Sequence, residues 1–390
     1  MRAMSVRFVT EKEDPASRAR LGRLFTPHGV VETPAFMPVG TQATVKTLAP
    51  WELVEAGAGM VLANSYHLYL RPGPAVIREA GGLARFSGWP GATLTDSGGF
   101  QLFSLSDLAR VTRDGVTFHS HLDGSLHFFS PEKVVELNFD FGPDVMMVLD
   151  ECTSYPSSHE EARTSMALTC EWAGRAHARY GELLAALPED ARAHTPAPFA
   201  VVQGSTYADL RRECAERLVA LGFAGYAVGG LGLGEPPSAR CEMTELVLGA
   251  LPPEAPRYLM GVGYPEDLLE AVGEGVDLFD CVLPTRNGRT GWLFTSRGRL
   301  VVKNATYARD FRPPDEDCSC PTCRNFSRAY LRHLFAAGEM LAPRLASLHN
   351  VHFFLHFMAG MRDALRRGEF DSFRRDFLGR YGGSRTAADA

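Results

Sequence analysis

The chain has 390 residues, of which 45% are hydrophobic and 22% charged, a composition that suits one large barrel with an appendage or two medium soluble domains. No uninterrupted apolar run approaches the ~20 residues of a membrane helix, and the first residues carry no secretory signal. We therefore expect a cytoplasmic protein with no membrane partner. The net charge of −6 argues weakly against a nucleic-acid partner, because an acidic surface repels a polyanion.

The amino-terminal segment Val6–Pro27 predicts a pair of strands that covers the bottom of the fold. Eight strand-sized apolar runs follow, and most are apolar throughout rather than alternating, which is the pattern of parallel strands covered on both faces. The runs are Thr33–Gly40, Met60–Asn64, Ala92–Asp96, Val145–Asp150, Phe199–Gln203, Tyr226–Gly230, Tyr258–Gly261 and Val276–Leu283.

The segments between these runs have the apolar spacing of helices. They are Pro50–Ala58, Pro131–Phe141, Ser158–Leu187, Tyr207–Leu221, Ser238–Leu248 and Pro265–Gly273. Eight strands that alternate with helices predict an α/β fold, a (β/α)8 TIM barrel, and leave an open doubly wound sheet as the alternative.

An insertion at Gln101–Phe129 contains the one His-x-His pair of the chain, His119 and His121. We predict a surface hairpin here rather than a pair of metal ligands. The chain has no His-Glu-x-x-His motif and its histidines are mostly scattered, so we expect no catalytic metal in the barrel.

Polar or bare-backbone residues end nearly every predicted strand. A single Asp after a strand can cap a helix, and a single Gly can serve only a turn. Because the strands of a parallel barrel all end at one mouth, the set as a whole predicts an active site there. Its members are Asn64, Asp96-Ser97-Gly98-Gly99, Asp150-Glu151, Gln203-Gly204, Gly229-Gly230, Gly261 and Asp280.

The carboxylates of this set indicate glycosyl chemistry. Asp280 lies inside an apolar run, so its carboxylate should be partly desolvated and its charge needs partners. Paired carboxylates without a metal are typical of reactions in which one group attacks or stabilises an anomeric carbon and another, such as Asp96, handles the proton of the leaving group. Asp150, Gln203 and the Gly229-Gly230 amides offer the acceptors and donors that suit a guanine-like edge. Retention and inversion at the anomeric carbon both stay open.

Near the carboxyl end, Cys318, Cys320 and Cys323 crowd into six residues, whereas the other five cysteines are scattered. With His349 they predict a closed, structural zinc site, and an iron–sulfur or free-thiol cluster is the alternative. The span 284–350 carries eleven Lys or Arg and five Asp or Glu, a local charge of +6. This excess fits either a face for nucleic acid or a chance cluster on a solvated surface.

These elements predict four regions. They are an N-terminal strand cap at 1–30, the catalytic barrel at 31–299, a zinc-binding insertion at 300–350, and a last barrel helix with the C-terminal tail at 351–390. Within the last region we expect a helix at Val351–Arg367.

Long motifs run through nearly the whole chain. They read TDSGGFQ at 95–101, LDECTSYP at 149–156, VVQG at 201–204, YAVGGLGLGE at 226–235, YLMGVGYPEDL at 258–268, FDCVLPTRNGR at 279–289 and CSCPTC at 318–323. In these motifs the chain resembles bacterial tRNA-guanine transglycosylase, the queuine tRNA-ribosyltransferase family, from about Phe8 to about Phe377.

The resemblance implies an enzyme of queuosine biosynthesis. It would exchange the wobble guanine of tRNAs with GUN anticodons (the Asn, Asp, His and Tyr tRNAs) for 7-aminomethyl-7-deazaguanine (preQ1), through a covalent aspartyl-ribose intermediate. A target base must leave its stack to enter a pocket, which costs less in an anticodon loop than in a duplex. The family commonly works as a homodimer with one structural zinc per chain.

The resemblance also implies individual roles. Asp280 matches the nucleophile and Asp96 the general acid/base. The residues that match the base-binding groups are Ser97, Phe100, Asp150, Cys152, Gln203, Gly229, Gly230, Leu231, Met260 and Gly261. Those that match the grip on the anticodon loop are Lys46, Thr285, Arg286 and Arg289, and the zinc ligands are Cys318, Cys320, Cys323 and His349.

One pair of residues departs from the family. Gly232-Leu233 stands where bacterial relatives usually have Ala-Val, at the pocket wall beside the aminomethyl group. Leu233 should narrow this wall and disfavour the cyclopentenediol of queuine, whereas Gly232 could let the loop yield. The incoming base, preQ1 or queuine, therefore stays open.

Two rival functions use parts of the same pattern. A non-catalytic RNA-binding subunit, as among eukaryotic relatives, is disfavoured because Asp96 and Asp280 are both present. A zinc-dependent barrel hydrolase is disfavoured because three cysteines and a histidine leave no open coordination position for water.

Overall fold

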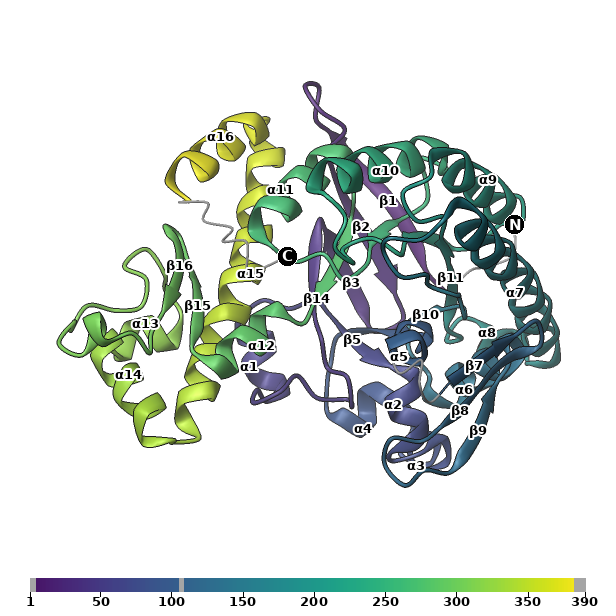
Figure 1. The fold of residues 1–390 in the computed structure, drawn as a ribbon, viewed down its shortest axis with the longest axis horizontal. Coiled ribbons are helices and arrows are strands. Elements are labelled where there is room, and N and C mark those ends of the chain that lie inside the picture. Colours follow the sequence, from purple (N-terminus) through teal and green to yellow (C-terminus); the bar gives the residue numbers. More distant parts are fainter. Residues whose placement is uncertain (1–4, 105–108, 382–390) are drawn as a thin grey trace.

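The structure is a computed structural model that describes residues 5–104 and 109–381 (Figure 1). Residues 1–4 of the predicted cap and 382–390 of the predicted tail lie outside the described residues. Helices surround a central sheet, and a smaller lobe built from the later part of the chain lies beside them.

The central sheet has eight parallel strands in the order β4-β14-β13-β12-β11-β10-β6-β5. Val39 pairs with Leu62 in parallel, and the backbone N–H of Gly40 donates to the carbonyl of Leu62 at 2.6 Å. The two ends of the strand order therefore meet and the sheet closes, so the predicted (β/α)8 barrel is confirmed and the open sheet is excluded. The strands are β4 (Ala35–Pro38), β5 (Met60–Asn64), β6 (Ala92–Asp96), β10 (Val145–Met147), β11 (Ala197–Val202), β12 (Gly225–Val228), β13 (Arg257–Leu259) and β14 (Leu278–Cys281).

Each of the six predicted helical segments contains a helix on the outside of the barrel. Local signals set where they begin: Ser130 accepts a hydrogen bond from the backbone of Lys133 at 3.1 Å, and Ser158 forms a capping box with Glu161. The helices are α1 (Pro50–Glu55), α6 (Pro131–Phe141), α7 (His159–Ala186), α9 (Ala208–Val219), α10 (Pro237–Ala250) and α11 (Pro265–Glu274). Shorter ones are α3 (Pro74–Glu79), α4 (Leu83–Ser87) and α8 (Glu189–Arg192).

The amino-terminal strands close the bottom of the barrel. The predicted pair is present as β1 (Arg7–Glu13) and β2 (Arg20–Thr26), and a third strand, β3 (Gly29–Thr33), pairs with β2. Buried side chains of this small sheet share one apolar cluster with the barrel interior. The Arg20 Nε donates to Asp277 Oδ1 at 2.9 Å, both side chains being buried, and so ties β2 to the start of β14.

The insertion after β6 forms a separate antiparallel sheet. It consists of β7 (Ala109–Thr112), β8 (Gly115–His119) and β9 (Leu126–Phe129), so the predicted hairpin is confirmed with one more strand. Two short helices that follow barrel strands, α2 (Ser65–Leu70) and α5 (Gly99–Ser104), complete this side of the molecule. Among the described residues, His119 and His121 belong to no cluster of metal-ligating groups.

The later part of the chain forms the lobe, coloured green to yellow-green in Figure 1. It contains β15 (Trp292–Thr295), β16 (Gly298–Val301), the 3-10 turn η2 (Ala305–Tyr307), α13 (Pro321–Asn325) and α14 (Arg328–Ala337). The long helix α15 (Leu341–Arg367) then runs back along the barrel against α12 (Leu283–Thr290), and α16 (Phe370–Arg380) follows.

The predicted start of α15 at Val351 is wrong, because the helix begins at Leu341. Its first turns bury Ala342, Leu345 and Leu348. The apolar face of the helix therefore extends from the cluster inside the lobe to the cluster beside the barrel. As a consequence, His349 lies on this helix rather than in a loop before it.

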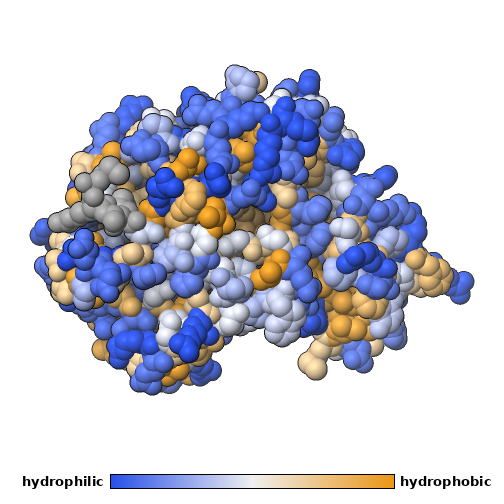
Figure 2. Space-filling view, turned by 180° about the vertical axis from the view of Figure 1, so that it is seen from behind, coloured by the Kyte–Doolittle hydropathy of each residue, from blue (hydrophilic) through white to orange (hydrophobic). Residues whose placement is uncertain are grey.

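The surface is mostly hydrophilic, with hydrophobic residues in small groups on the face drawn in Figure 2. Among the described residues, no helix is both long and apolar enough to cross a membrane.

Candidate active site

A cavity of about 710 Å³ opens where the barrel strands end. Residues from the ends of all eight predicted strands line it, so the predicted convergence of polar groups at one mouth is present. From the predicted set, the lining residues are Asn64, Asp96, Phe100, Asp150, Cys152, Gln203, Gly229, Gly230, Leu231, Met260, Gly261, Asp280 and Arg286.

The three aspartates predicted at the strand ends each have different partners in the cavity. Asp280 Oδ1 accepts two hydrogen bonds, from the Tyr258 hydroxyl at 2.6 Å and from the Gly261 backbone N–H at 2.8 Å. Asp96 Oδ2 accepts from Asn64 Nδ2 at 2.8 Å. The sequence reasoning did not identify Tyr258, because a tyrosine at the start of an apolar strand is typical of a core.

Asp150 is held from two sides. Its Oδ2 accepts from Gln203 Nε2 at 2.8 Å and its Oδ1 accepts from the Ser97 hydroxyl at 3.3 Å. Ser97 is fully buried and does not line the cavity, so it supports Asp150 from behind. The carboxylate of Asp150 and the amide of Gln203 are thereby held side by side, with a defined order of hydrogen-bond donors and acceptors.

Burial raises the pKa of all three carboxyl groups. For Asp96 the pKa rises to about 7, first because of desolvation and then because of the negative charges of Asp150 and Asp280. Desolvation likewise raises the pKa of Asp150 and of Asp280 above the usual range, although their hydrogen bonds oppose it. A carboxyl group that titrates near neutral pH beside two others is suited to general acid/base catalysis.

Two glycines leave backbone exposed to the cavity. Gly230 has φ of +63°, and a Cβ placed there would lie 2.2 Å from Gln203 Oε1. A Cβ on Gly229 would lie 2.4 Å from Val201 Cγ1. A side chain at either position would displace Gln203 or Val201, so the bare backbone is required.

Arg211 was not predicted, because an arginine near the start of α9 is usually solvated. Its side chain is fully buried, and Nη1 donates to the carbonyls of Val202 at 2.9 Å and Gly229 at 2.8 Å, while Nε donates to Ser205 at 2.8 Å. Desolvation lowers its pKa to about 10, which still leaves it charged at neutral pH. Arg211 thus ties the ends of β11 and β12 together behind the cavity.

Glu235 is a second buried group that sequence reasoning missed. Its two carboxylate oxygens accept from the backbone N–H groups of Gly232 at 2.5 Å and Leu233 at 2.9 Å. The carboxylate of Glu235 therefore holds the backbone of the loop that includes the unusual Gly232-Leu233 pair. Both residues of the pair line the cavity.

Of the four predicted RNA-binding residues, only Arg286 lines the cavity. Arg286 is exposed on α12 and lines the cavity, Lys46 is exposed in the β4–α1 loop, and Arg289 is half-buried. Thr285 is buried, and its hydroxyl donates to the Val282 carbonyl at 3.4 Å.

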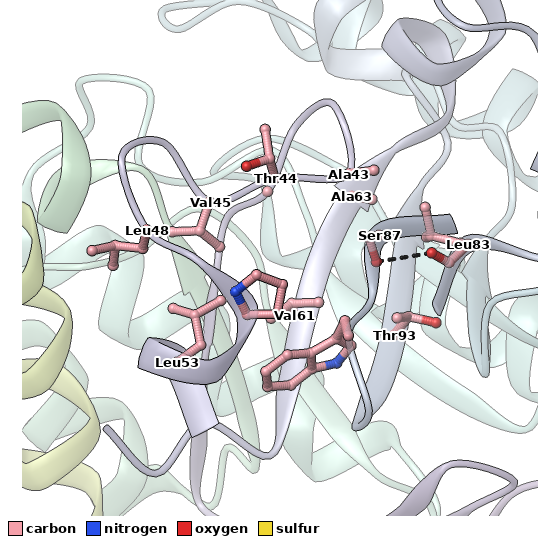
Figure 3. A pocket seen from close by; sticks show the side chains of 13 residues that line it. Ala43, Thr44, Val45, Leu48, Leu53, Val61, Ala63, Leu83, Ser87 and Thr93 are labelled. Atoms are coloured by element: carbon pink, nitrogen blue, oxygen red, sulfur yellow. Dashed lines mark hydrogen bonds between the residues drawn. The ribbon is translucent and has the colours of Figure 1, made fainter. Parts of the chain in front are cut away.

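A smaller cavity of about 150 Å³ lies between α1, α4 and the strands β5 and β6 (Figure 3). The described residues that line it are mostly apolar, and none is ionisable. Its Ser87 hydroxyl is already used, since it donates to the Leu83 carbonyl at 2.9 Å. The described lining of this cavity therefore offers no ionisable group for acid/base chemistry.

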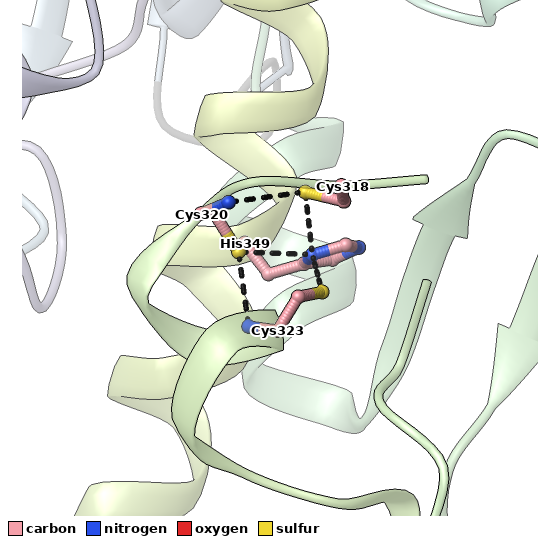
Figure 4. Close-up of side chains that lie close together, drawn as sticks. All are labelled: Cys318, Cys320, Cys323 and His349. Atoms are coloured by element: carbon pink, nitrogen blue, oxygen red, sulfur yellow. Dashed lines mark hydrogen bonds between the residues drawn. The ribbon is translucent and has the colours of Figure 1, made fainter. Parts of the chain in front are cut away.

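The predicted metal ligands converge at the base of the lobe (Figure 4). The Sγ atoms of Cys318, Cys320 and Cys323 lie 3.8, 3.4 and 3.3 Å from His349 Nδ1, and all four ligand atoms are within 4.8 Å of one another. These spacings fit four atoms around one ion at 2.0–2.3 Å. His349 Nε2 lies 2.7 Å from the Phe294 carbonyl, so it donates there and leaves Nδ1 as the ligand. The cluster can hold a metal ion that joins α13 to α15.

We expect Cys320→Ser to lose the bound metal and to lower the melting temperature by about 5 °C or more, because the metal links the lobe to α15. Metal content and thermal unfolding would be measured on the same preparation. Cys241→Ser is the matched control, since Cys241 is a single half-buried cysteine on α10. An unchanged metal content in Cys320→Ser would contradict the assignment.

Residues 14–383 match the family model described as queuine tRNA-ribosyltransferase. The chain is 53% identical over 381 residues to a queuine tRNA-ribosyltransferase of Caldanaerobacter subterraneus subsp. tengcongensis, covering 98% of this chain and 99% of that protein. It is 54% identical over 378 residues to the protein of that name from Symbiobacterium thermophilum, covering 97% and 92%. A third such protein, from Thermoanaerobacter pseudethanolicus, is 52% identical over 386 residues, covering 98% and 99%.

Proposed function

This chain belongs to the queuine tRNA-ribosyltransferase family of pentosyltransferase enzymes, and we propose that it exchanges the wobble guanine of tRNAs with GUN anticodons for preQ1. The observation that carries the proposal is the presence of Asp96, Asp150 and Asp280 in one cavity that can hold an extruded purine with its ribose.

Asp280 is the proposed nucleophile. Both hydrogen bonds to its carboxylate go to Oδ1, and among the described residues none donates to Oδ2. Oδ2 is thus the oxygen free to attack C1′ of the ribose as the bond from C1′ to the base nitrogen breaks. The product is an ester between Asp280 and the ribose, and the electron pair of the broken bond leaves with guanine.

Asp96 is the proposed general acid and base. In its protonated form it gives a proton to the departing guanine, and as a carboxylate it then takes the proton of the incoming base. The incoming base displaces Asp280 from C1′, which restores both aspartates. A pKa of about 7 keeps both forms of Asp96 accessible at neutral pH.

The remaining groups of the cavity would recognise the base edge. Asp150 suits adjacent N–H donors of guanine, and Gln203 with the Gly230 amide suits its carbonyl. The Leu231 carbonyl is proposed to accept from the exocyclic amine, and the exposed Phe100 to stack on the ring. Cys152, Met260, Gly229 and Gly261 complete the proposed base-binding wall. The pKa of Cys152 is raised to about 12 by burial, so its thiol stays neutral.

Lys46, Thr285, Arg286 and Arg289 are proposed to bind the anticodon loop of the Asn, Asp, His and Tyr tRNAs. RNA binding would account for the excess of positive charge in residues 284–350, because phosphate contacts dominate the affinity for nucleic acids. Zinc is the proposed ion of the Cys318, Cys320, Cys323 and His349 cluster, where it would stabilise the lobe. We also propose a homodimer.

The base choice can be tested by mass spectrometry of tRNA after incubation with guanine, preQ1 or queuine. We expect the wild type to incorporate preQ1 and to use queuine poorly, because Leu233 borders the cavity and narrows it. Leu233→Ala should raise kcat/KM for queuine relative to preQ1 by about 10-fold or more, since each methylene in a pocket alters discrimination by about that factor.

Leu233→Ala leaves Leu231 and Glu235 in place. The rate at which this variant exchanges guanine, compared with the wild type, therefore serves as the internal control. A wild-type enzyme that uses queuine as well as preQ1 would overturn the base assignment and leave the reaction class intact. Absence of any base exchange by the purified wild type would overturn the proposed function.

A further inference from the structure

The side of the mouth next to Asp96 carries two histidines to which the site above assigns no role. His67 lies on α2, directly after β5, and His121 lies in the turn between β8 and β9. Their ring centroids are 5.5 Å apart, with the rings nearly perpendicular. Two segments distant in sequence thus bring two imidazoles to one place.

The cluster is fixed relative to the catalytic acid. The backbone N–H of His67 donates to Asn64 Oδ1 at 3.2 Å, and the amide nitrogen of the same Asn64 donates to Asp96 Oδ2 at 2.8 Å. On the other side, the Tyr66 hydroxyl lies 2.8 Å from His121 Nδ1. Burial raises the pKa of Tyr66, so it keeps its proton. Because Nδ1 of His121 is engaged with Tyr66, Nε2 is the nitrogen left to bind another partner.

The charges around His67 are positive. Burial lowers its pKa first, and the positive charges of His121 and Lys46 lower it further. The nearest acid in the β8–β9 turn, Asp123, is engaged by Ser125 at 2.7 Å, and the charge of His127 also acts on it. The cluster therefore gathers basic groups at the rim of the cavity, and the acid of its own turn already has hydrogen-bond partners, an arrangement that favours an anionic partner.

The strand order places this cluster in line with the proposed RNA-binding residues. Around the mouth β14, β4 and β5 are neighbours, so α12 with Arg286, the β4–α1 loop with Lys46, and α2 with His67 follow one another. A single RNA strand that crosses the mouth with one base in the cavity would run along such an arc.

We propose that His67 and His121, with Lys46, bind a phosphodiester of the RNA strand next to the exchanged nucleotide. The inference rests on the proposed function and extends its RNA-binding surface to α2 and the β8–β9 turn. A phosphate beside His67 favours the protonated imidazole, so binding takes up a proton. RNA affinity should therefore increase as the pH falls from 8 to 6.

The test measures binding of an RNA hairpin with a GUN anticodon loop to His67→Gln and His121→Gln, at pH 6 and 8 and at several salt concentrations. We expect each variant to raise Kd at pH 6 by about 5- to 10-fold, as for loss of a charge-assisted hydrogen bond. The slope of log K against log salt should become shallower by up to about 0.7 per lost contact. His121→Lys should restore affinity and weaken the pH dependence, because His67 would still take up a proton on binding.

His119→Gln is the matched control, because His119 is exposed on the same hairpin and its Nδ1 lies 3.0 Å from the Gly124 carbonyl. If His67→Gln and His121→Gln match His119→Gln in affinity, pH dependence and salt slope while the wild type exchanges base, this inference is wrong and the proposed function stands. A loss of affinity with an unchanged salt slope would also overturn it, since that outcome indicates altered packing. Absence of exchange by the wild type would instead refute the proposed function.

Discussion

Asp280→Asn is expected to lower the rate of base exchange by about 10⁴-fold or more, in the range seen when a catalytic nucleophile is removed. An amide keeps the size of the carboxylate but cannot form the ester to ribose. The same variant should form no covalent RNA–protein complex, and a denaturing gel would detect the complex in the wild type. Its thermal stability should stay equal or rise, because burial raises the pKa of Asp280 and so disfavours its charge in the folded state.

Asp277→Asn is the matched control, three residues earlier in the chain. Asp277 lies at the closed end of the barrel, where its buried carboxylate pairs with Arg20 at 2.9 Å. We expect this variant to lose about 3–5 kcal/mol of unfolding free energy, since it leaves a buried guanidinium unpaired, while its folded fraction still exchanges base. Measurable exchange by Asp280→Asn, or an adduct in that variant, would remove Asp280 from the role of nucleophile.

Asp96→Asn is expected to slow guanine release by about 10²- to 10⁴-fold, the usual contribution of a general acid. In the wild type, release in a single turnover should fall as the pH rises through about 7, because Asp96 must carry a proton to give one to guanine and its pKa is about 7. Above that pH the protonated fraction declines tenfold per unit. Asp96→Asn should lose this inflection, and rapid-quench measurements between pH 6 and 9 would detect the difference.

Glu274→Gln provides the control for titration elsewhere in the protein. Desolvation also raises the pKa of Glu274 to about 7, yet this residue ends α11 and does not line the cavity. The inflection should therefore persist in Glu274→Gln. An inflection near pH 7 that persists in Asp96→Asn would assign the proton transfer to another group.

The sequence predicted the fold because its signal is local and repeated. Continuous apolar runs such as Val145–Asp150 and Phe199–Gln203 indicate strands covered on both faces, and the structure places a strand in each. The predicted segments Pro131–Phe141 and Ser158–Leu187 begin within one residue of the starts of α6 and α7. The start of α15 was missed because a helix that crosses from lobe to barrel has no cap residue there: Met340 precedes it without a side-chain hydrogen bond.

The chemistry of the mouth was predictable as far as it depends on which residue ends a strand. Asp96, Asp150, Gln203 and Asp280 converge because parallel strands present their carboxyl ends on one side, a consequence of connectivity alone. The cluster of three cysteines and a histidine was predictable because thiols so close in sequence are typical of metal sites.

The sequence by itself determined the alternation of strands and helices, the acids at the strand ends and the metal cluster, because each depends on short-range pattern. Tertiary structure alone decided which residues support them. Arg211 reaches the carbonyl of Gly229 from 18 positions away, and Tyr258 reaches Asp280 from 22. His67 and His121 meet across 54 positions in the chain. Such contacts depend on how the barrel closes and how its loops fold over the mouth, and no local periodicity encodes that distance.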